Sequence, residues 1–142
     1  MWQARQIKRS KEVTGCTIMI YIASPYTHKN PTYREYRYKM ALYYVYQCFM
    51  KGEPVFSPIV HNHSMAKHYD MPKEFEFWRA INDNFIINSI SIRVLMLHGW
   101  RQSQGVTHEI AFAETYDKPV SYIKVNITGH IISHTKEKPD AD

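Results

Sequence analysis

The seven residues TIMIYIA (17–23) form a short apolar run that ends at the turn sequence SPYT (24–27). A run of this length, rich in β-branched residues and closed by a turn, is typical of a strand buried on both faces, as in a parallel sheet. Asn30 and Pro31 follow and supply a helix N-cap and a first helical position. This stretch therefore predicts the first strand and the first crossover helix of an α/β domain.

The helix that begins at Pro31 is expected to be amphipathic and to stop at Gly52. Its apolar side chains occur in pairs at every fourth residue, which places them on one face. They are Met40, Ala41, Tyr44, Val45, Cys48 and Phe49. A second short strand, PVFSPI (54–59), follows the glycine and continues the alternation of strand and helix.

The rest of the chain repeats this alternation. The segment 71–89 predicts a helix with Asp70 as its cap and Pro72 in its first turn. Beyond it we expect a strand at 90–97, a helix at about 105–116 and a last strand at 118–125. Strands that alternate with helices are joined by crossovers and lie parallel.

We predict an α/β fold with a doubly wound, mainly parallel sheet of four to five strands and flanking helices, of the flavodoxin or Rossmann type. The expected domain spans residues 17–132. A basic N-terminal arm (1–16) precedes it, and a polar C-terminal tail (133–142) follows it.

The bulk composition narrows the class of protein. The chain has 142 residues, of which 44% are hydrophobic and 22% charged, as in one globular domain. It has no apolar run that could span a bilayer and no apolar segment of a secretory signal at its start, so we expect a cytoplasmic protein. Cys16 and Cys48 lack the spacing of a zinc or disulfide framework.

The net charge of +5 would suit nucleic acid, because basic surfaces attract phosphates. The excess is nevertheless concentrated in the first residues and on one helix, which favours an exposed arm and a solvated helix face over a binding groove. It also suits a site that attracts a small anionic ligand. We therefore expect no membrane partner and do not favour nucleic acid, although a protein that binds nucleic acid through the basic arm and the tyrosines stays open as an alternative. The charges concerned are Arg5, Lys8, Arg9 and Lys11 in the arm, and Arg34, Arg37 and Lys39 on the helix.

In a doubly wound fold the ligand binds beyond the carboxyl ends of the strands. The loops at those ends are Ala23-Ser24-Pro25-Tyr26, Pro58 to His63, and His98 to Gly105. Glu109 lies just past the third loop, where free N–H groups and the helix dipole would lower the proton affinity of a carboxylate. It is a candidate nucleophile toward a sugar, and Asp83 a candidate proton donor to the departing base. The alternative is that both are solvated helix residues.

Five segments of the chain follow one another in an order that resembles a known family. They are IYIASPYT (20–27), a helix, a Pro-rich second strand, FWRAINDNFIINS (77–89) and VLMLHGWRQSQGVTHEIAFAETYDKPV (94–120). This order resembles the nucleoside 2-deoxyribosyltransferase superfamily, in particular its small phage- and bacterium-associated branch, the domain of unknown function DUF1937. The most specific element is Ser-x-Gly-x-x-x-Glu before an apolar helix and Lys-Pro-Val. Here it consists of Ser103, Gly105, Glu109, Lys118, Pro119 and Val120.

The resemblance implies a function and roles for several residues. It implies cleavage or transfer of the N-glycosidic bond of a (deoxy)nucleoside or its 5′-monophosphate, through a covalent sugar–enzyme intermediate and without a cofactor. Glu109 would be the nucleophile, Asp83 would handle the proton of the base, and Tyr26 would orient the nucleophile. Ser103 would contact a phosphate. The further candidates for substrate binding are Ala23, Ser24, Pro25, His61, His63, Trp100 and Gly105.

The resemblance also implies a homo-oligomer, in the host cytoplasm if a phage encodes the chain. The tyrosines of the helix after Pro31 fit a face packed against a second subunit. A departure keeps another function open, because Asn88-Ser89-Ile90-Ser91 replaces a usual aspartate at the third strand. The alternative is a protein of the same fold that binds a nucleotide without turning it over.

Histidines raise the question of a metal. His61 and His63, with His68 and Asp70 nearby, would be able to hold zinc if they lay on an extended segment. The chain lacks both the helical His-Glu-x-x-His pattern and a cysteine partner, so we expect these histidines to line a polar pocket and no metal to bind. We expect His108 to point away from the site that holds Glu109.

Overall fold

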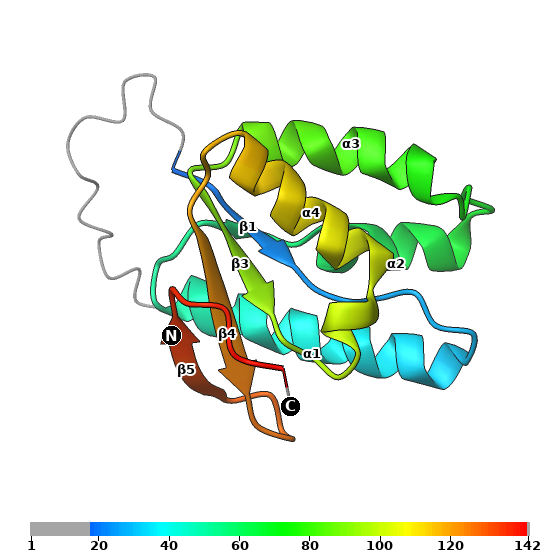
Figure 1. Ribbon diagram of the computed structural model, residues 1–142. Coiled ribbons are helices and arrows are strands. Elements are labelled where there is room, and N and C mark those ends of the chain that lie inside the picture. The colour runs from blue at the N-terminus through cyan, green and yellow to red at the C-terminus, as the bar shows by residue number, and fades with distance from the viewer. Residues whose placement is uncertain (1–17, 142) are drawn as a thin grey trace.

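The computed structural model describes residues 18–141 (Figure 1). The expected basic arm and Cys16 lie outside the described residues. Strands and helices alternate along most of the chain, as the sequence predicted. The elements are β1 (Ile20–Ala23), α1 (Pro31–Met50), β2 (Val55–Phe56), α2 (Pro58–His68), α3 (Phe75–Ile87), β3 (Ser91–Leu95), the 3-10 turn η1 (Trp100–Gln102), α4 (Gln104–Thr115), β4 (Val120–Val125) and β5 (Ile131–Thr135).

The five strands form one sheet in the order β2-β1-β3-β4-β5. Strands β2, β1, β3 and β4 are parallel, and β5 is antiparallel to β4. This is the strand order of flavodoxin-like sheets with the last strand reversed, so the predicted fold class is confirmed. The chain moves outward from β1 to β2 and then crosses back to β3. The order therefore reverses between β1 and β3, whose carboxyl ends border a natural ligand site.

The helices cover both faces of the sheet, with α1 on one face and α3 and α4 on the other (Figure 1). Side chains of β1 alternate between the two faces, as strand geometry requires. Ile22 packs in the cluster with α1, whereas Tyr21 and Ala23 pack with α3 and α4. All three are completely buried, as the continuous apolar run predicted.

Helix α1 begins and ends close to its predicted bounds. The side chain of Asn30 accepts a hydrogen bond from the Thr32 N–H, and Pro31 is the first helical residue. Gly52, just beyond the helix, has a φ of +77°, which glycine adopts without strain. Cys48 lies fully buried on the inner face of the helix, as expected for a packing residue, whereas Phe49, which was expected on the same face, is 58% exposed.

Two predictions in the middle of the chain were wrong. The expected loop from Pro58 to His63 belongs to helix α2, because Ser57 caps it by accepting from the Val60 N–H and Pro58 is well suited to a first helical position. Helix α3 begins at Phe75, with Glu74 at its cap position, rather than after Asp70. The carbonyl of Pro72 accepts a hydrogen bond from the indole of Trp78 instead of starting the helix.

Strand β5 extends the sheet three residues past the expected domain boundary at residue 132. The turn before it is organised by Asn126, whose side-chain oxygen accepts from the N–H groups of Thr128 and His130. Gly129 in the same turn has a φ of +91°. Residues 133–135 were predicted to belong to a polar tail. They instead form backbone hydrogen bonds with β4 as part of β5. None of the helices between residues 18 and 141 combines the length and apolarity that a membrane crossing requires.

Candidate functional site

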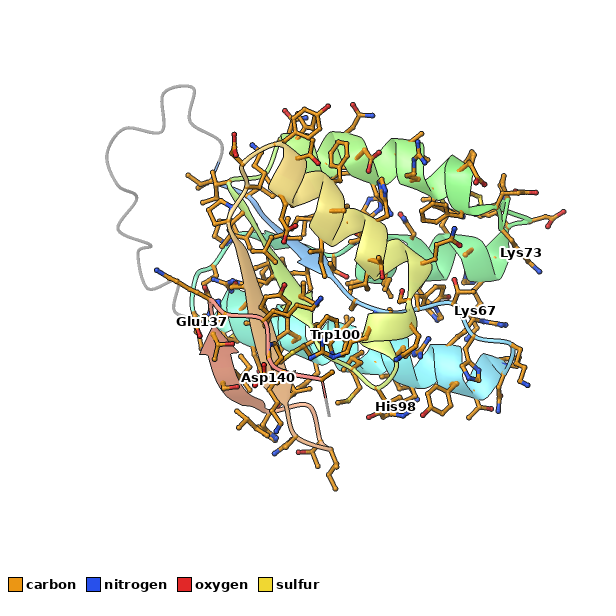
Figure 2. All side chains as sticks on the ribbon, in the orientation of Figure 1. Lys67, Lys73, His98, Trp100, Glu137 and Asp140 are labelled. Carbon is orange, nitrogen blue, oxygen red and sulfur yellow. The ribbon has the colours of Figure 1, made fainter. Side chains whose placement is uncertain are left out.

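A pocket of about 1010 Å³ lies where the sheet order reverses, beyond the carboxyl ends of β1 and β3. Its walls come from the loop after β1, from α1 and α2, from the start of α3 and from the first turns of α4. Figure 2 shows Lys67 and Lys73 at the end of the molecule where α2 and α3 meet. Glu137 and Asp140 lie near β5 and β4, away from this end.

The structure brings six of the predicted site residues together around this pocket, although they come from three separate segments. They are Ser24, Tyr26, His63, Ser103, Gly105 and Glu109. The rule that ligands bind at the carboxyl ends of the strands therefore located the pocket.

Five other predicted residues do not line the pocket. Ala23 and Pro25 are fully buried and are not part of the pocket wall. His61 is exposed on α2 and packs against Phe56. The ring of Trp100 contacts Tyr122, with centroids 5.8 Å apart. Asp83 lies behind His108, which is itself part of the pocket wall.

Glu109 is held at the base of the pocket by the local sequence of α4. Ser103 caps the helix by accepting from the Val106 N–H at 3.3 Å. Gly105 and Glu109 are four residues apart and share one helix face. A Cβ atom on Gly105 would lie 3.7 Å from Oε1 of Glu109, so the glycine leaves space beside that oxygen. The other oxygen, Oε2, accepts a hydrogen bond from the hydroxyl of Tyr21.

The protonation of Glu109 differs from the expectation. Its side chain is only 7% exposed, and this burial, with a smaller contribution from the charge of Asp83, raises its pKa to about 8. The hydrogen bond from Tyr21 acts in the opposite direction and favours the carboxylate. Glu109 lies in the second turn of α4 rather than at its N-terminal end, where the helix dipole acts most strongly. Burial therefore dominates over the dipole effect that the sequence suggested.

His108 lies in the pocket wall, contrary to the expectation that it points away. Its Nε2 is 2.8 Å from Oδ1 of Asp83, which comes from the neighbouring helix α3. Arg79 approaches the other oxygen of Asp83 at 4.0 Å. Asp83 thus reaches the pocket through His108, which lines the same pocket as Glu109.

Tyr26 contacts a different partner from the one expected. Its hydroxyl lies 2.6 Å from Nδ1 of His63, and Nε2 of His63 lies 2.9 Å from Oε2 of Glu35. Tyr21, from inside strand β1, is the tyrosine that holds Glu109. The site therefore contains two hydrogen-bonded groups of ionisable residues, one on α4 and α3 and one on the loop after β1, α1 and α2.

Three buried side-chain atoms in the described part of the chain lack a hydrogen-bond partner, and all three belong to residues of the pocket wall. They are Oγ of Ser24, Nε of Arg37 and Oδ1 of Asn82. Buried polar atoms are nearly always paired, so a concentration of unpaired ones in one pocket indicates a place for a polar ligand.

Arg37 connects the two loops at the switch point. It donates to the carbonyl of Thr27 at 2.8 Å and to that of His98 at 3.0 Å, and it is 7% exposed. A Cβ atom at Gly99 would lie 2.8 Å from Nη2 of Arg37, so this glycine permits the close approach. Burial lowers the pKa of Arg37 from its very high ordinary value.

The pocket wall carries more cations than anions. Its lysines and arginines are Arg34, Arg37, Lys67, Lys73 and Arg79, and its acidic residues are Glu35, Asp70 and Glu109. Because the pKa of Glu109 is raised, the positive excess near neutral pH is larger than the residue types alone indicate. Such a wall favours an anionic or electron-rich ligand.

Residues 18–141 contain no group of three or more His, Cys, Asp or Glu side chains placed to hold a metal ion. His61 and His63 lie on helix α2 rather than on an extended segment. Two residues apart on a helix, they point in different directions and cannot share one ion.

Three features of the site were not predicted from the sequence. Tyr21 carried a signal, since its hydroxyl is the only side-chain polar group within the strand residues 20–23. Arg37 was assigned to a solvated helix face, although it lies among the buried positions of α1. The pairing of His108 with Asp83 depends on how α3 packs against α4, which no local pattern reveals.

A comparison with families of known proteins found a match. The sequence model of a family described as "Domain of unknown function (DUF1937)" matches residues 18–125, which include β1 to β4 and every residue of the pocket wall. No curated protein is significantly similar to the chain.

Proposed function

The chain belongs to the DUF1937 family, and we propose that it cleaves or transfers the N-glycosidic bond of a (deoxy)nucleoside or its 5′-monophosphate, with Glu109 as the nucleophile. The observation that carries this proposal is the carboxyl group of Glu109. Tyr21 fixes one of its oxygens, and the other faces the space that Gly105 leaves free. The resemblance of the Ser103 to Val120 segment to nucleoside 2-deoxyribosyltransferases supports the same chemistry.

The first step forms a covalent sugar–enzyme intermediate. An oxygen of ionised Glu109 bonds to the anomeric carbon C1′, while the bond from C1′ to the base nitrogen breaks and its electron pair stays with the base. The reacting form is the carboxylate, which a pKa of about 8 leaves as a minority of roughly one molecule in ten at pH 7. The hydrogen bond from Tyr21 increases that fraction.

The departing base needs a proton. His108 lines the pocket one residue before Glu109, and Asp83 accepts a hydrogen bond from its Nε2. We therefore assign the delivery of this proton to His108, with Asp83 as the residue that orients it. In this assignment Asp83 still takes part in the proton transfer, but His108 rather than Asp83 contacts the base.

The chemistry of the pocket wall supports a nucleotide as the ligand. The excess of cations suits a 5′-phosphate, and Ser103 retains a hydroxyl hydrogen to donate because its oxygen accepts from the helix backbone. The unpaired amide oxygen of Asn82 is an acceptor for a base N–H group. Transfer and hydrolysis differ only in whether a second base or water attacks the sugar intermediate.

A second function has an observation of its own. The raised pKa of Glu109 makes its carboxyl group a hydrogen-bond donor in most molecules near neutral pH, and a protonated carboxyl is a poor nucleophile. A protein with such a group can bind a nucleotide without turning it over. This nucleotide-binding alternative predicts that the ligand is recovered intact.

A homo-oligomer in the cytoplasm remains our expectation. On α1, apolar side chains at spacings of four, seven and eight residues are strongly exposed, namely Leu42 (41%), Tyr46 (56%), Phe49 (58%) and Met50 (65%). These positions form one stripe on the outer face of the helix. Light scattering should give a molar mass that is a multiple of the 16.9 kDa chain.

The test is a product assay. The purified protein is incubated with deoxynucleosides, ribonucleosides and their 5′-monophosphates, with and without a free acceptor base, and the bases are separated by chromatography. We expect a released or exchanged base that disappears in Glu109→Gln and persists in Glu114→Gln, a control at an exposed glutamate of the same helix. Unchanged turnover in Glu109→Gln would exclude the nucleophile, and intact ligand throughout would favour the binding function.

A further inference from the structure

The side of the pocket that the first step does not use contains Tyr26, His63 and Glu35. The hydroxyl of Tyr26 lies 2.6 Å from Nδ1 of His63, and Nε2 of His63 lies 2.9 Å from Oε2 of Glu35. All three residues belong to the pocket wall. They come from the loop after β1, from α2 and from α1, so the fold assembles a hydrogen-bonded row from three elements.

The imidazole of His63 is held firmly in this row. The ring of Tyr38 stacks on it with centroids 3.9 Å apart and an angle of 14° between the planes. The ring of Tyr26 meets it edge-on, with centroids 5.6 Å apart. His63 is 9% exposed, and both of its ring nitrogens have partners, so its orientation is fixed from every side.

The donors and acceptors of the row have one consistent arrangement when His63 is neutral. A carboxylate only accepts, so Nε2 of His63 carries the hydrogen that it donates to Glu35. Nδ1 is then the acceptor, and the hydroxyl of Tyr26 donates to it. Burial raises the pKa of Tyr26, which keeps this hydroxyl protonated near neutral pH. Tyr26 lines the pocket, so the lone pairs of its oxygen can accept a hydrogen bond from a bound reactant.

We infer that Tyr26, His63 and Glu35 form a proton relay that accepts the proton of the second reactant, water or an acceptor base, when that reactant attacks the sugar intermediate. This role rests on the proposed function and deepens it, because it assigns the second half of the reaction to a different set of residues from the first. Tyr26 is the catalytic residue of the relay, and His63 and Glu35 act through it.

With water as the second reactant, one bond to C1′ forms and one breaks. The water oxygen bonds to C1′, and the bond between C1′ and Glu109 breaks, which returns the carboxylate. The water proton passes to the oxygen of Tyr26 while the original hydroxyl proton of Tyr26 passes to Nδ1 of His63. The resulting imidazolium donates to Glu35 through Nε2 and later loses its extra proton to solvent. An acceptor base loses its N–H proton by the same route.

The experiment separates the two steps with a substrate that the wild-type protein turns over. In Tyr26→Phe we expect a rapid first release of about one base per site, followed by turnover slowed roughly 100-fold or more, as for loss of a general base. The sugar adduct on Glu109 should then accumulate and be visible by intact-protein mass spectrometry. Sodium azide should restore turnover and yield a glycosyl azide, because azide attacks without giving up a proton.

The controls distinguish a relay from a packing role. Tyr43→Phe removes the hydroxyl of a tyrosine on α1 that, like Tyr26, contacts a histidine; its partner is His130, at 3.1 Å on the exposed surface. It should leave both steps unchanged. Glu35→Gln should keep the rapid first release and slow only the second step, by less than Tyr26→Phe does.

Each other outcome has a definite meaning. If Tyr26→Phe turns over like the wild type while Glu109→Gln is inactive, the relay is wrong and the proposed function stands. If Tyr26→Phe slows the first base release as much as turnover, and azide restores nothing, Tyr26 has a structural role and the relay is also wrong. If the wild type releases no base from any substrate, both the function and the relay are overturned.

Discussion

Replacement of Glu109 by glutamine should make the stability of the protein less sensitive to pH. Burial raises the pKa of this carboxyl group from 4.5 to about 8 in the folded state. The folded protein therefore binds the proton more tightly than the unfolded chain, and the free energy of unfolding falls as the pH rises from 4.5 toward 8. The stabilisation is complete below pH 4.5 and is lost above pH 8.

The size of the effect follows from the shift. Each pH unit between the two pKa values changes the free energy of unfolding by about 1.4 kcal/mol, so the whole window corresponds to about 5 kcal/mol. Between pH 5 and pH 8 this group should remove about 3 kcal/mol from the wild type and nothing from Glu109→Gln. The amide of glutamine still offers an oxygen to the hydroxyl of Tyr21.

Urea unfolding at pH 5, 6, 7 and 8 measures this difference directly. The free energies of wild type and Glu109→Gln are subtracted at each pH, which cancels the contributions of all other titrating groups. Glu114→Gln is the matched control, since the same substitution at an exposed position of α4 should give a difference that varies little with pH. A wild-type minus Glu109→Gln difference that stays constant within about 0.5 kcal/mol would show that Glu109 is ionised in the fold, and the reasoning would be refuted.

Three further predictions concern the same site. Tyr21→Phe removes the hydrogen bond that lowers the pKa of Glu109, so the rise of kcat/KM with pH should move to a pH above about 8; an unmoved profile would argue against Tyr21 as its partner. Arg37→Met removes two hydrogen bonds from a buried guanidinium to loop carbonyls and should lower the free energy of unfolding by about 3 kcal/mol in urea. A decrease below about 0.5 kcal/mol would show that Arg37 does not hold the two loops together. Ser103→Ala removes the cap of α4 and should lower the free energy of unfolding by about 1 kcal/mol, with Ser103→Asn as the variant expected to retain it.

The parts of the fold that the sequence predicted are those with a local pattern. The apolar run of β1, the paired apolar residues of α1 and the segment around β3 each encode their structure over several residues. Helix α2 was not predicted, because its start at Ser57-Pro58 resembles the turn after a strand. Its capping hydrogen bond forms only in the folded chain. Strand β5 was not predicted, because it is held as a strand by pairing with β4 rather than by a pattern in its own sequence.

The candidate site was predictable to the same degree. Ser103, Gly105 and Glu109 form a local motif next to a strand end, and the pocket lies there. The partners of Glu109 were not predictable in this way. Tyr21 is 88 residues away in the sequence, and its contact with Glu109 exists only because α4 packs over β1. The raised pKa has the same origin, since burial is a property of the packed molecule.

The bridge that Arg37 makes between the carbonyls of Thr27 and His98 has a consequence for how the pocket receives a ligand. The two carbonyls belong to the loops on either side of the point where the strand order reverses, and one guanidinium holds both. These loops are therefore in place before anything binds. A ligand that enters between them loses little free energy to ordering the backbone, so more of the energy of its contacts remains as affinity.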